Sequence, residues 1–233
     1  MMTKELKKRI FTSIVLLTIV LSCLYINNYS WLILLFVVSF FCCVEFFNII
    51  KKIRINLNLK IILIISSISL LFLFIYSAYK IKVTGSPEIV LFLLLVCIFS
   101  DIGGYVVGKT VGGKKLTKIS PNKTISGSFG SFLFSLFPVG IFLILHEIIK
   151  LDYFILSSTT YFENTIIIIC VILSFVCQIG DLIISYFKRM AKVKDTGRIL
   201  PGHGGFLDRI DGTIFAIPAI YYLQINFTII HWF

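Results

Sequence analysis

Residues 31–50 read WLILLFVVSFFCCVEFFNII, a run of twenty positions in which Glu45 is the one charged side chain. A helix needs about 20 mostly apolar residues to cross the hydrocarbon core of a membrane. Six further runs of this kind lie along the chain. The seven candidate spans are residues 10–26, 31–50, 61–79, 89–107, 128–149, 165–187 and 213–233. The expected fold is an all-α, polytopic transmembrane helical bundle with about seven spans.

The composition of the 233-residue chain supports this expectation. Hydrophobic residues make up 58% and charged residues 14%, against roughly 45–50% and about 25% in soluble domains. A soluble domain of this length could not bury so much apolar surface, so a water-soluble globule and a disordered chain are excluded. The six cysteines all fall inside apolar runs, which indicates small buried side chains rather than a disulfide framework.

The positions of the basic residues predict how the chain is threaded. Of the 22 Lys and Arg residues, all but Lys80, Lys82 and Lys150 fall before the first run or in every second loop after it. Basic residues collect in cytoplasmic loops, so we expect a cytoplasmic N-terminus and an external C-terminus. Residues 80–88 and 150–164 are expected to be short external loops. The net charge of +11 then needs no nucleic-acid partner to explain it.

Four aspartates fall at the expected cytoplasmic ends of spans. Asp101 and Asp181 lie in runs that travel inward, and Asp208 and Asp211 come just before the last run. An aspartate at the centre of a span costs roughly 2.5–3.5 kcal/mol on insertion scales, so each of these residues requires an explanation. An interhelical pair is the structural alternative for Asp101. A shared cation is the better explanation for the other three, because neighbouring carboxylates repel one another.

The expected cytoplasmic loops supply groups that bind phosphate. Residues 112–115 read GGKK, residues 123–128 read KTISGS, and residues 202–205 read GHGG. Lysines and exposed backbone N–H groups hold phosphate, and carboxylates hold Mg²⁺ together with substrate phosphates. The spacing of a Walker P-loop is absent. The combination indicates metal-assisted transfer of a phosphate group. Glu45 and Glu147, which lack such neighbours, are interpreted as paired or snorkelling interior residues.

One stretch resembles a known family. Residues 185–211, SYFKRMAKVKDTGRILPGHGGFLDRID, are similar to the pattern of the phosphatidate cytidylyltransferase (CDP-diacylglycerol synthase) family. The fixed positions of that pattern are met by Ser185, Lys188, Arg189, Lys194, Asp195, Pro201, His203, Gly204, Gly205, Asp208, Arg209 and Asp211. A second block resembles the family at Asp101, Tyr105, Gly108 and residues 120–124, whereas Ser126 and Gly104 depart from it.

The resemblance implies transfer of a cytidylyl group from CTP to phosphatidic acid, which gives CDP-diacylglycerol and pyrophosphate in phospholipid biosynthesis. It implies Mg²⁺ as cofactor and leaves open a second, monovalent ion. The expected partners are CTP, phosphatidic acid and the lipid bilayer, without nucleic acid, and relatives suggest a homodimer. The expected location is the cytoplasmic membrane, with the site facing the cytoplasm. The chain is expected to form one integral-membrane domain, with N-terminal spans in residues 1–88 and catalytic spans and loops in residues 89–233.

The resemblance also assigns roles to residues. Asp181, Asp208 and Asp211 would hold the metal, and Asp101 would be a further ligand or orient a metal-bound water; Lys194 is a further catalytic candidate. The candidate substrate-binding residues are Ser120, Lys123, Thr124, Lys188, Arg189, His203, Gly204, Gly205 and Arg209.

Three other functions were weighed against this one. A CTP-dependent lipid-alcohol kinase shares the need for metal, CTP and a bilayer acceptor, but the match over residues 185–211 argues against it. A CDP-alcohol phosphotransferase would need a D-G-x-x-A-R arrangement, and no Arg follows Asp211 at that spacing. A secondary transporter would place its carboxylates near mid-bilayer, whereas these are expected at one face.

Overall fold

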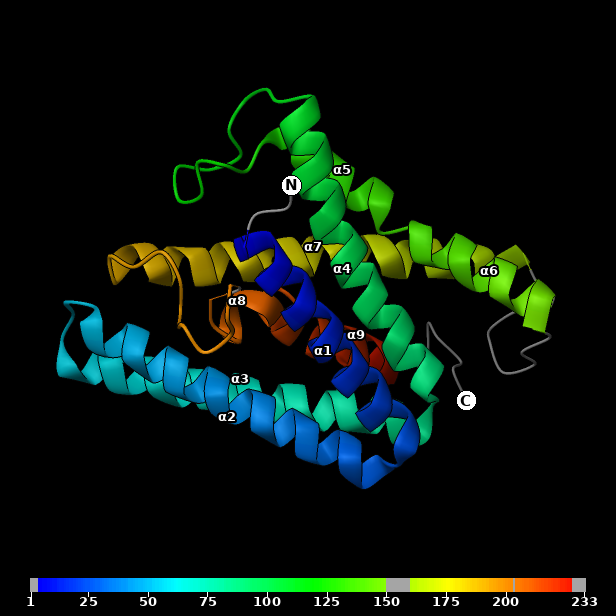
Figure 1. The fold of residues 1–233 in the computed structure, drawn as a ribbon, viewed down its shortest axis with the longest axis horizontal. Coiled ribbons are helices and arrows are strands. Elements are labelled where there is room, and N and C mark those ends of the chain that lie inside the picture. The colour runs from blue at the N-terminus through cyan, green and yellow to red at the C-terminus, as the bar shows by residue number, and fades with distance from the viewer. Residues whose placement is uncertain (1–3, 150–159, 203, 228–233) are drawn as a thin grey trace. The chain divides into compact units, whose positions relative to one another are not determined.

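The computed structural model describes residues 4–149, 160–202 and 204–227. Within these residues the regular secondary structure is helical, apart from two isolated β-bridges (Figure 1). In chain order the helices are α1 (Lys4–Ile26), α2 (Asn28–Lys52), α3 (Leu57–Thr84), α4 (Pro87–Thr110), α5 (Ile125–Phe134), α6 (Phe137–Ile149), α7 (Thr160–Met190), α8 (Leu207–Ile210) and α9 (Thr213–Phe227).

The expected fold class is confirmed. Six stretches of the described residues are long and apolar enough to cross a membrane, and they are Lys7–Ile26, Asn28–Lys52, Leu57–Thr84, Pro87–Thr110, Ile125–Leu145 and Ile166–Met190. The seventh predicted span, residues 213–233, is represented by a shorter apolar helix, Thr213–Gln224. The last six residues of the predicted span, 228–233, lie outside the described residues. The protein is therefore a multi-pass, all-α membrane protein, while its sidedness stays a prediction.

Helix ends are set by local capping signals. Asn27 and Ser30 form a reciprocal capping box at the start of α2, and the Ser86 side chain caps α4 ahead of Pro87. These side chains accept hydrogen bonds from backbone N–H groups that have no partner within the helix. The bounds predicted for the external loop, residues 80–88, are wrong, because α3 runs on to Thr84 and only two residues separate it from α4. That this connection lies outside stays a prediction. Backbone hydrogen bonds extend the helix past the apolar run. Residues 150–159 of the other expected external loop lie outside the described residues.

The fifth predicted span, residues 128–149, is not one continuous helix. It divides into α5 and α6, with a turn at residues 135–136. Pro138 explains the break, because a proline has no N–H to donate to the carbonyl four residues earlier and its ring clashes with that carbonyl. Pro138 lies in the first turn of α6, where a proline is tolerated.

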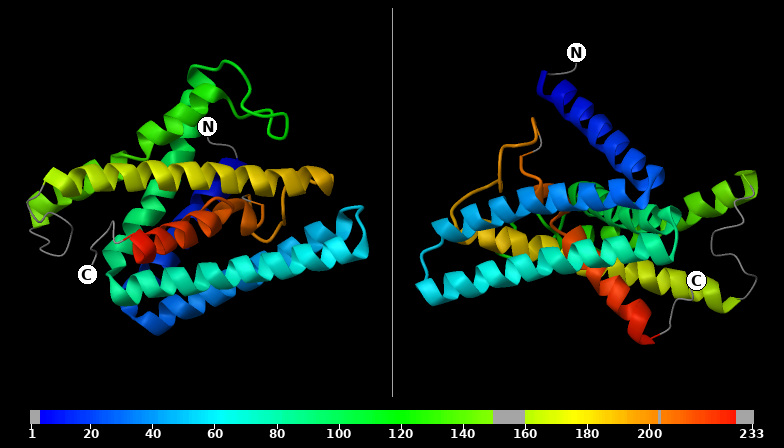
Figure 2. Two further views of the ribbon diagram at one scale, coloured as in Figure 1. Left: turned by 180° about the vertical axis from the view of Figure 1, so that it is seen from behind. Right: turned by 90° about the horizontal axis from the view of Figure 1, so that it is seen from below.

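The chain divides into two compact units. The first unit is Met1–Tyr79 with Ile184–Asp211, and the second is Lys80–Ile183 with Gly212–Phe233. The unit boundary falls within the length of α7. In the first unit, α2 and α3 run antiparallel beside each other (Figures 1 and 2). The Trp31 indole N–H donates to the carbonyl of Ala78 at 3.2 Å and ties the two helices together at one end.

In the second unit, glycines let α4 and α5 pack closely. A Cβ atom on Gly130 would lie 2.5 Å from the Cβ of Val107 and 2.7 Å from the carbonyl oxygen of Gly103. A Cβ atom on Gly103 would likewise collide with the carbonyl oxygen of Gly130 and the side chain of Phe134. Small residues at such a crossing bring backbones together, which favours helix association in lipid.

Buried polar side chains add a second link between helices of this unit. The hydroxyls of Ser100 on α4 and Ser174 on α7 lie 2.8 Å apart. Gln178 donates to the Ser174 hydroxyl at 3.3 Å and accepts from the Ser128 hydroxyl of α5. Polar groups in hydrocarbon cost free energy unless they find a partner, so this chain of hydrogen bonds holds α4, α5 and α7 in one arrangement.

The glycine crossing predicts the effect of a larger side chain. Gly130→Val should lower the thermal midpoint of the detergent-solubilised protein, because overpacking a tight contact costs about 1–3 kcal/mol. Gly140→Val is the matched control, since a Cβ atom on Gly140 meets no atom within 4 Å. Thermal unfolding of both variants measures the difference, and equal midpoints would contradict the proposed packing.

Candidate functional site

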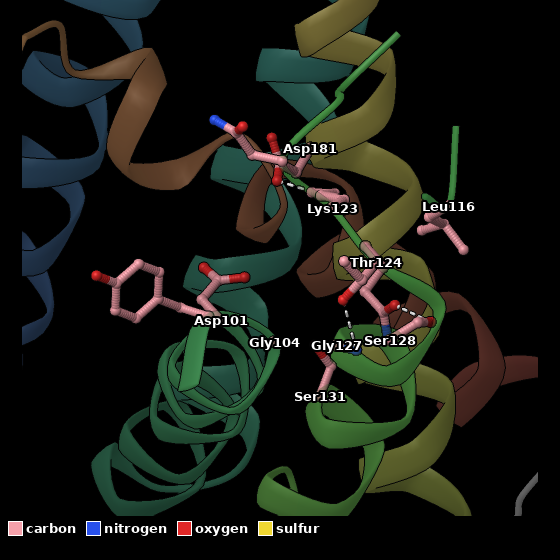
Figure 3. Close-up of a pocket in the computed structure, with 12 residues that line it drawn as sticks. Asp101, Gly104, Leu116, Lys123, Thr124, Gly127, Ser128, Ser131 and Asp181 are labelled. Carbon is pink, nitrogen blue, oxygen red and sulfur yellow. Dashed lines mark hydrogen bonds and ion pairs between the residues drawn. The ribbon is translucent and has the colours of Figure 1, made fainter. Parts of the chain in front are cut away.

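A cavity of about 250 Å³ in the second unit collects several of the predicted site residues (Figure 3). It is lined by Asp101, Gly104, Tyr105, Leu116, Asn122, Lys123, Thr124, Gly127, Ser128, Ser131, Gln178 and Asp181. These residues come from α4, α5, α7 and the loop before α5. Sequence blocks separated by tens of residues thus line a single space.

Two of the lining residues, Lys123 and Asp181, form an ion pair. The Lys123 Nζ lies 2.5 Å from Oδ2 of Asp181, and each side chain remains about one-quarter exposed. A tight turn presents the lysine, because its N–H donates to the carbonyl of Ser120 at 3.0 Å. Ser120 itself is not among the residues that line the cavity; it supports the turn.

Asp101 enters the same cavity from α4. Its side chain is exposed, and the Cys177 thiol lies 4.0 Å from its Oδ1. Figure 3 shows the carboxylates of Asp101 and Asp181 reaching the cavity from different helices, with Lys123 pairing to Asp181. The cavity therefore offers oxygen ligands for a cation together with a positive charge for a phosphate.

The beginning of α5 forms another wall. The Thr124 hydroxyl caps this helix by accepting the N–H of Gly127 at 3.1 Å. Gly108 leaves room for that hydroxyl, since a Cβ atom there would lie only 3.0 Å from it. The positive end of the helix dipole favours anions. This end of the cavity is therefore suited to a phosphate group.

A second group of predicted residues lies in the first unit, around Asp208. Lys188 on α7 forms a 2.9 Å ion pair with Oδ1 of Asp208. The other carboxylate oxygen accepts the backbone N–H groups of Thr196 at 2.8 Å and Gly205 at 3.2 Å. Burial alone would raise the pKa of Asp208, but the hydrogen bond from Lys188 and those from the backbone lower the pKa below its ordinary value. Asp208 is therefore ionised at neutral pH.

A polar cavity of about 300 Å³ lies beside the loop that connects α7 to α8. Its lining residues are Arg9, Lys194, Asp195, Gly202, Gly204 and Arg209. Gly202 and Gly204 have φ angles of 78° and 88°, values that side-chain-bearing residues rarely adopt. Arg9 of α1 lies directly against the loop, since a Cβ atom on Gly202 would lie 3.1 Å from the Cγ of Arg9. Three cationic side chains against one carboxylate make this cavity suited to an anion.

The remaining predicted residues have varied positions. Arg189 is exposed in the last turn of α7, Asp211 directly follows α8, and His203 lies outside the described residues. The predicted metal ligands are divided between units, with Asp181 in the second and Asp208 and Asp211 in the first. Across the residues that the structure describes, no three His, Cys, Asp or Glu side chains form a group that could hold a metal ion.

Sequence reasoning missed the contribution of two residues near the N-terminus. Arg9 was counted only among basic residues that set the topology, yet it lines the polar cavity. Glu45 was interpreted as a paired or snorkelling residue, and it is buried and hydrogen-bonded to Thr196, Phe206 and Leu207. A carboxylate inside an apolar run was a usable signal for Glu45. No local pattern indicates the partners of Glu45, because they lie about 150 to 160 residues away along the chain.

The chain is similar in sequence to known proteins. The model of the cytidylyltransferase family matches residues 78–227. The phosphatidate cytidylyltransferase of Staphylococcus saprophyticus is 41% identical over 138 residues, which are 59% of this chain and 49% of that protein. The Bacillus subtilis protein of the same name is 41% identical over 140 residues, 59% of this chain and 48% of its own length.

The chain spans about half the length of these relatives. The family match nevertheless covers more than half of the chain and includes every predicted site residue from Asp101 to Asp211. On this basis the chain belongs to the cytidylyltransferase family.

Proposed function

We propose that this protein transfers the cytidylyl group of CTP to phosphatidic acid and so forms CDP-diacylglycerol and pyrophosphate. The observation that carries the proposal is the family match over residues 78–227. The matched range contains the residues that line the second-unit cavity and the segment around Asp208. The relatives that share about 41% identity are named for this reaction. Their bacterial origin supports the cytoplasmic membrane as the location. That the site faces the cytoplasm stays a prediction from the positions of the basic residues.

The reaction asks for positioning and charge stabilisation more than for covalent chemistry by the protein. A phosphate oxygen of phosphatidic acid attacks the α-phosphorus of CTP. The bond between that phosphorus and the oxygen bridging to the β-phosphate breaks, and pyrophosphate leaves. The attacking oxygen is ionised, so no general base is required. Aligned reactants and preorganised cations account for most of such a rate enhancement.

The donor set of the second-unit cavity fits Mg²⁺. This ion prefers oxygen ligands and is usually held by one or two carboxylates together with water and substrate phosphates. Asp101 and Asp181 both line the cavity and could supply those carboxylates. When bound there, Mg²⁺ would neutralise charge on the triphosphate. The assignment of Asp208 and Asp211 to the same metal, the monovalent ion and the homodimer all stay predictions from the resemblance.

The cationic side chains in the two cavities would bind phosphates. Lys123 and the capped beginning of α5 would contact phosphate groups of the nucleotide in the second unit. Lys194 and Arg209 line the polar cavity of the first unit and would contact a phosphate of CTP or of the lipid. Charge-assisted hydrogen bonds of this kind are about twice as strong as neutral ones.

Isotope transfer tests the reaction directly. Purified protein, supplied with phosphatidic acid, Mg²⁺ and CTP labelled at the α-phosphorus, should form a labelled lipid and unlabelled pyrophosphate. Lipid extraction followed by chromatography measures the product. Transfer of a γ-label to a polyprenol would instead identify a lipid-alcohol kinase. Folded protein that transfers neither label would contradict the proposal.

The ion pair in the second unit predicts two sensitive substitutions. Asp181→Asn and Lys123→Met should each lower kcat about 100-fold or more, in the range seen when one preorganised charge-stabilising group is removed. Asp181→Asn should also raise the Mg²⁺ concentration needed for half-maximal rate. Glu88→Gln, in the first turn of α4 and away from the cavity lining, is the control. Steady-state kinetics that find Asp181→Asn as active as Glu88→Gln would remove Asp181 from the site.

The polar cavity predicts that α1 takes part in substrate binding. Arg9→Gln should raise the KM of one phosphate-bearing substrate about tenfold, as expected for the loss of ~1.5 kcal/mol from a charged hydrogen bond. Lys8→Gln changes an exposed neighbour that does not line the cavity and should leave both KM values unchanged. Separate titrations of CTP and phosphatidic acid identify the substrate concerned. Unchanged KM values in Arg9→Gln would exclude this role.

A further inference from the structure

We infer that Glu45, on α2, is a positioning residue. It holds the loop between α7 and α8, which carries Lys194, and the helix α8, which carries Asp208 and Arg209, in their working conformation. The inference rests on the proposed function, in which residues of that loop and of α8 contact a phosphate. Glu45 lies outside the matched residues 78–227 and comes from an N-terminal helix, so the family match gives no reason to expect it there. The reasons are its burial, its hydrogen bonds and the glycines around it.

Glu45 is buried in the first unit, with 2% of its surface exposed. Its Oε1 accepts the backbone N–H of Phe206 at 3.1 Å, and its Oε2 accepts that of Leu207 at 2.9 Å. Oε2 also accepts the hydroxyl of Thr196 at 2.7 Å. A buried carboxylate is costly unless it is well hydrogen-bonded, and these three donors meet that requirement. All three come from the loop and the helix that follows it.

Two of these bonds replace a missing helix cap. The helix α8, Leu207–Ile210, has no side-chain hydrogen bond from its own N-cap residue, Phe206. A four-residue helix has no stability of its own, and its first N–H groups need acceptors. Glu45 supplies these acceptors from another helix. Since α8 carries Asp208 and Arg209, the position of both depends on this contact.

Thr196 connects Glu45 to Asp208. Its hydroxyl lies 2.7 Å from Oε2 of Glu45 and 3.0 Å from Oδ2 of Asp208, and its N–H donates to the same Oδ2 at 2.8 Å. The hydroxyl has one proton to donate, so the two carboxylates share this donor. Lys188 offsets part of the resulting negative charge through its ion pair with Asp208. A change at Glu45 should therefore reach Asp208 through one intervening residue.

Glycines on the loop leave space for the Glu45 side chain. A Cβ atom on Gly197 or Gly205 would collide with the carboxylate of Glu45. Gly205 belongs to the motif by which the sequence resembles its family, and this contact gives a physical reason for a glycine there. One turn earlier on α2, Phe41 stacks on Phe206 with ring centroids 5.0 Å apart and planes 8° from parallel. The α2 helix therefore holds the loop at two neighbouring points.

Glu45 has a role different from that of a substrate ligand. With 2% exposure and its oxygens engaged by loop donors, it offers no surface to CTP or to a lipid phosphate. It acts on the reaction by fixing the residues that would contact phosphate.

The test compares Glu45→Gln with Glu88→Gln, a matched change in the second unit. The glutamine amide keeps the volume of the side chain but replaces one acceptor with a donor that faces a backbone N–H. We expect kcat to fall at least tenfold while the KM for CTP changes less than threefold. Trypsin should also cleave at least tenfold faster between Lys192 and Arg198, where the basic residues are exposed. Glu88→Gln should match the wild type in both measurements.

Two loop variants make the test independent of Glu45 itself. Gly205→Ala, which crowds the carboxylate, and Thr196→Val, which removes the shared donor, should reproduce both effects. Because Glu45 and Thr196 act through the same contact, the double variant should be no worse than the more impaired single variant. If Glu45→Gln fails to insert into the membrane, these loop variants decide the question. Wild-type proteolysis and unchanged kcat in Glu45→Gln, or in both loop variants, would overturn the inference.

The proteolysis measurement also separates this inference from the proposed function. It reports the state of the loop whether or not the protein forms CDP-diacylglycerol. Wild-type protein that forms no labelled lipid, together with rapid loop cleavage in Glu45→Gln, would contradict the proposed function and keep the anchoring contact. An active wild-type protein with an unaffected Glu45→Gln variant would contradict the anchoring role alone.

Discussion

A polar group inside a lipid-embedded protein has no bulk water to bond with, and this constraint governs the described part of the chain. Backbone groups satisfy it by forming helices. Buried side chains satisfy it by pairing, as the Ser100 and Ser174 hydroxyls do between α4 and α7. Glu45 satisfies it with three donors from one loop. The hydrogen bonds that offset the free-energy cost of burying these polar groups also determine which segments are held together.

Each unit contains a lysine–aspartate ion pair, which is about one-quarter exposed in the second unit and largely buried in the first. Lys123 pairs with Asp181 in the second unit, and Lys188 pairs with Asp208 in the first. An exposed pair contributes little to stability, so the Lys123–Asp181 pair is not well explained as a fold-stabilising element. Lys123 and Asp181 both line the cavity of the second unit, so their charges are available to bind phosphate and a divalent cation. This is the physical connection between the structure and the proposed reaction.

Close backbone approach gives the glycines of this chain two separate functions. At Gly103 and Gly130 the absence of a side chain lets α4 and α5 pack closely, and that packing brings Thr124 to the cavity wall. At Gly197 and Gly205 it leaves room for a carboxylate from α2. Gly202 and Gly204 differ from both groups, because their positive φ angles shape the loop itself. The glycine-rich loop between α7 and α8, whose sequence suggests phosphate binding, therefore also accommodates the side chain of Glu45.

The sequence by itself determined the membrane-spanning helical class and the family, because length, hydropathy and short motifs are local properties. It predicted Asp101, Lys123 and Asp181 as site residues, and the structure places all three at one cavity. Hydropathy alone did not predict the break near Pro138, although a proline inside an apolar run is a local signal for such a break. Only the tertiary structure brought Glu45 to Leu207 and Arg9 to Arg209. Contacts between residues so far apart in the chain depend on how whole helices pack, and no local pattern records that packing.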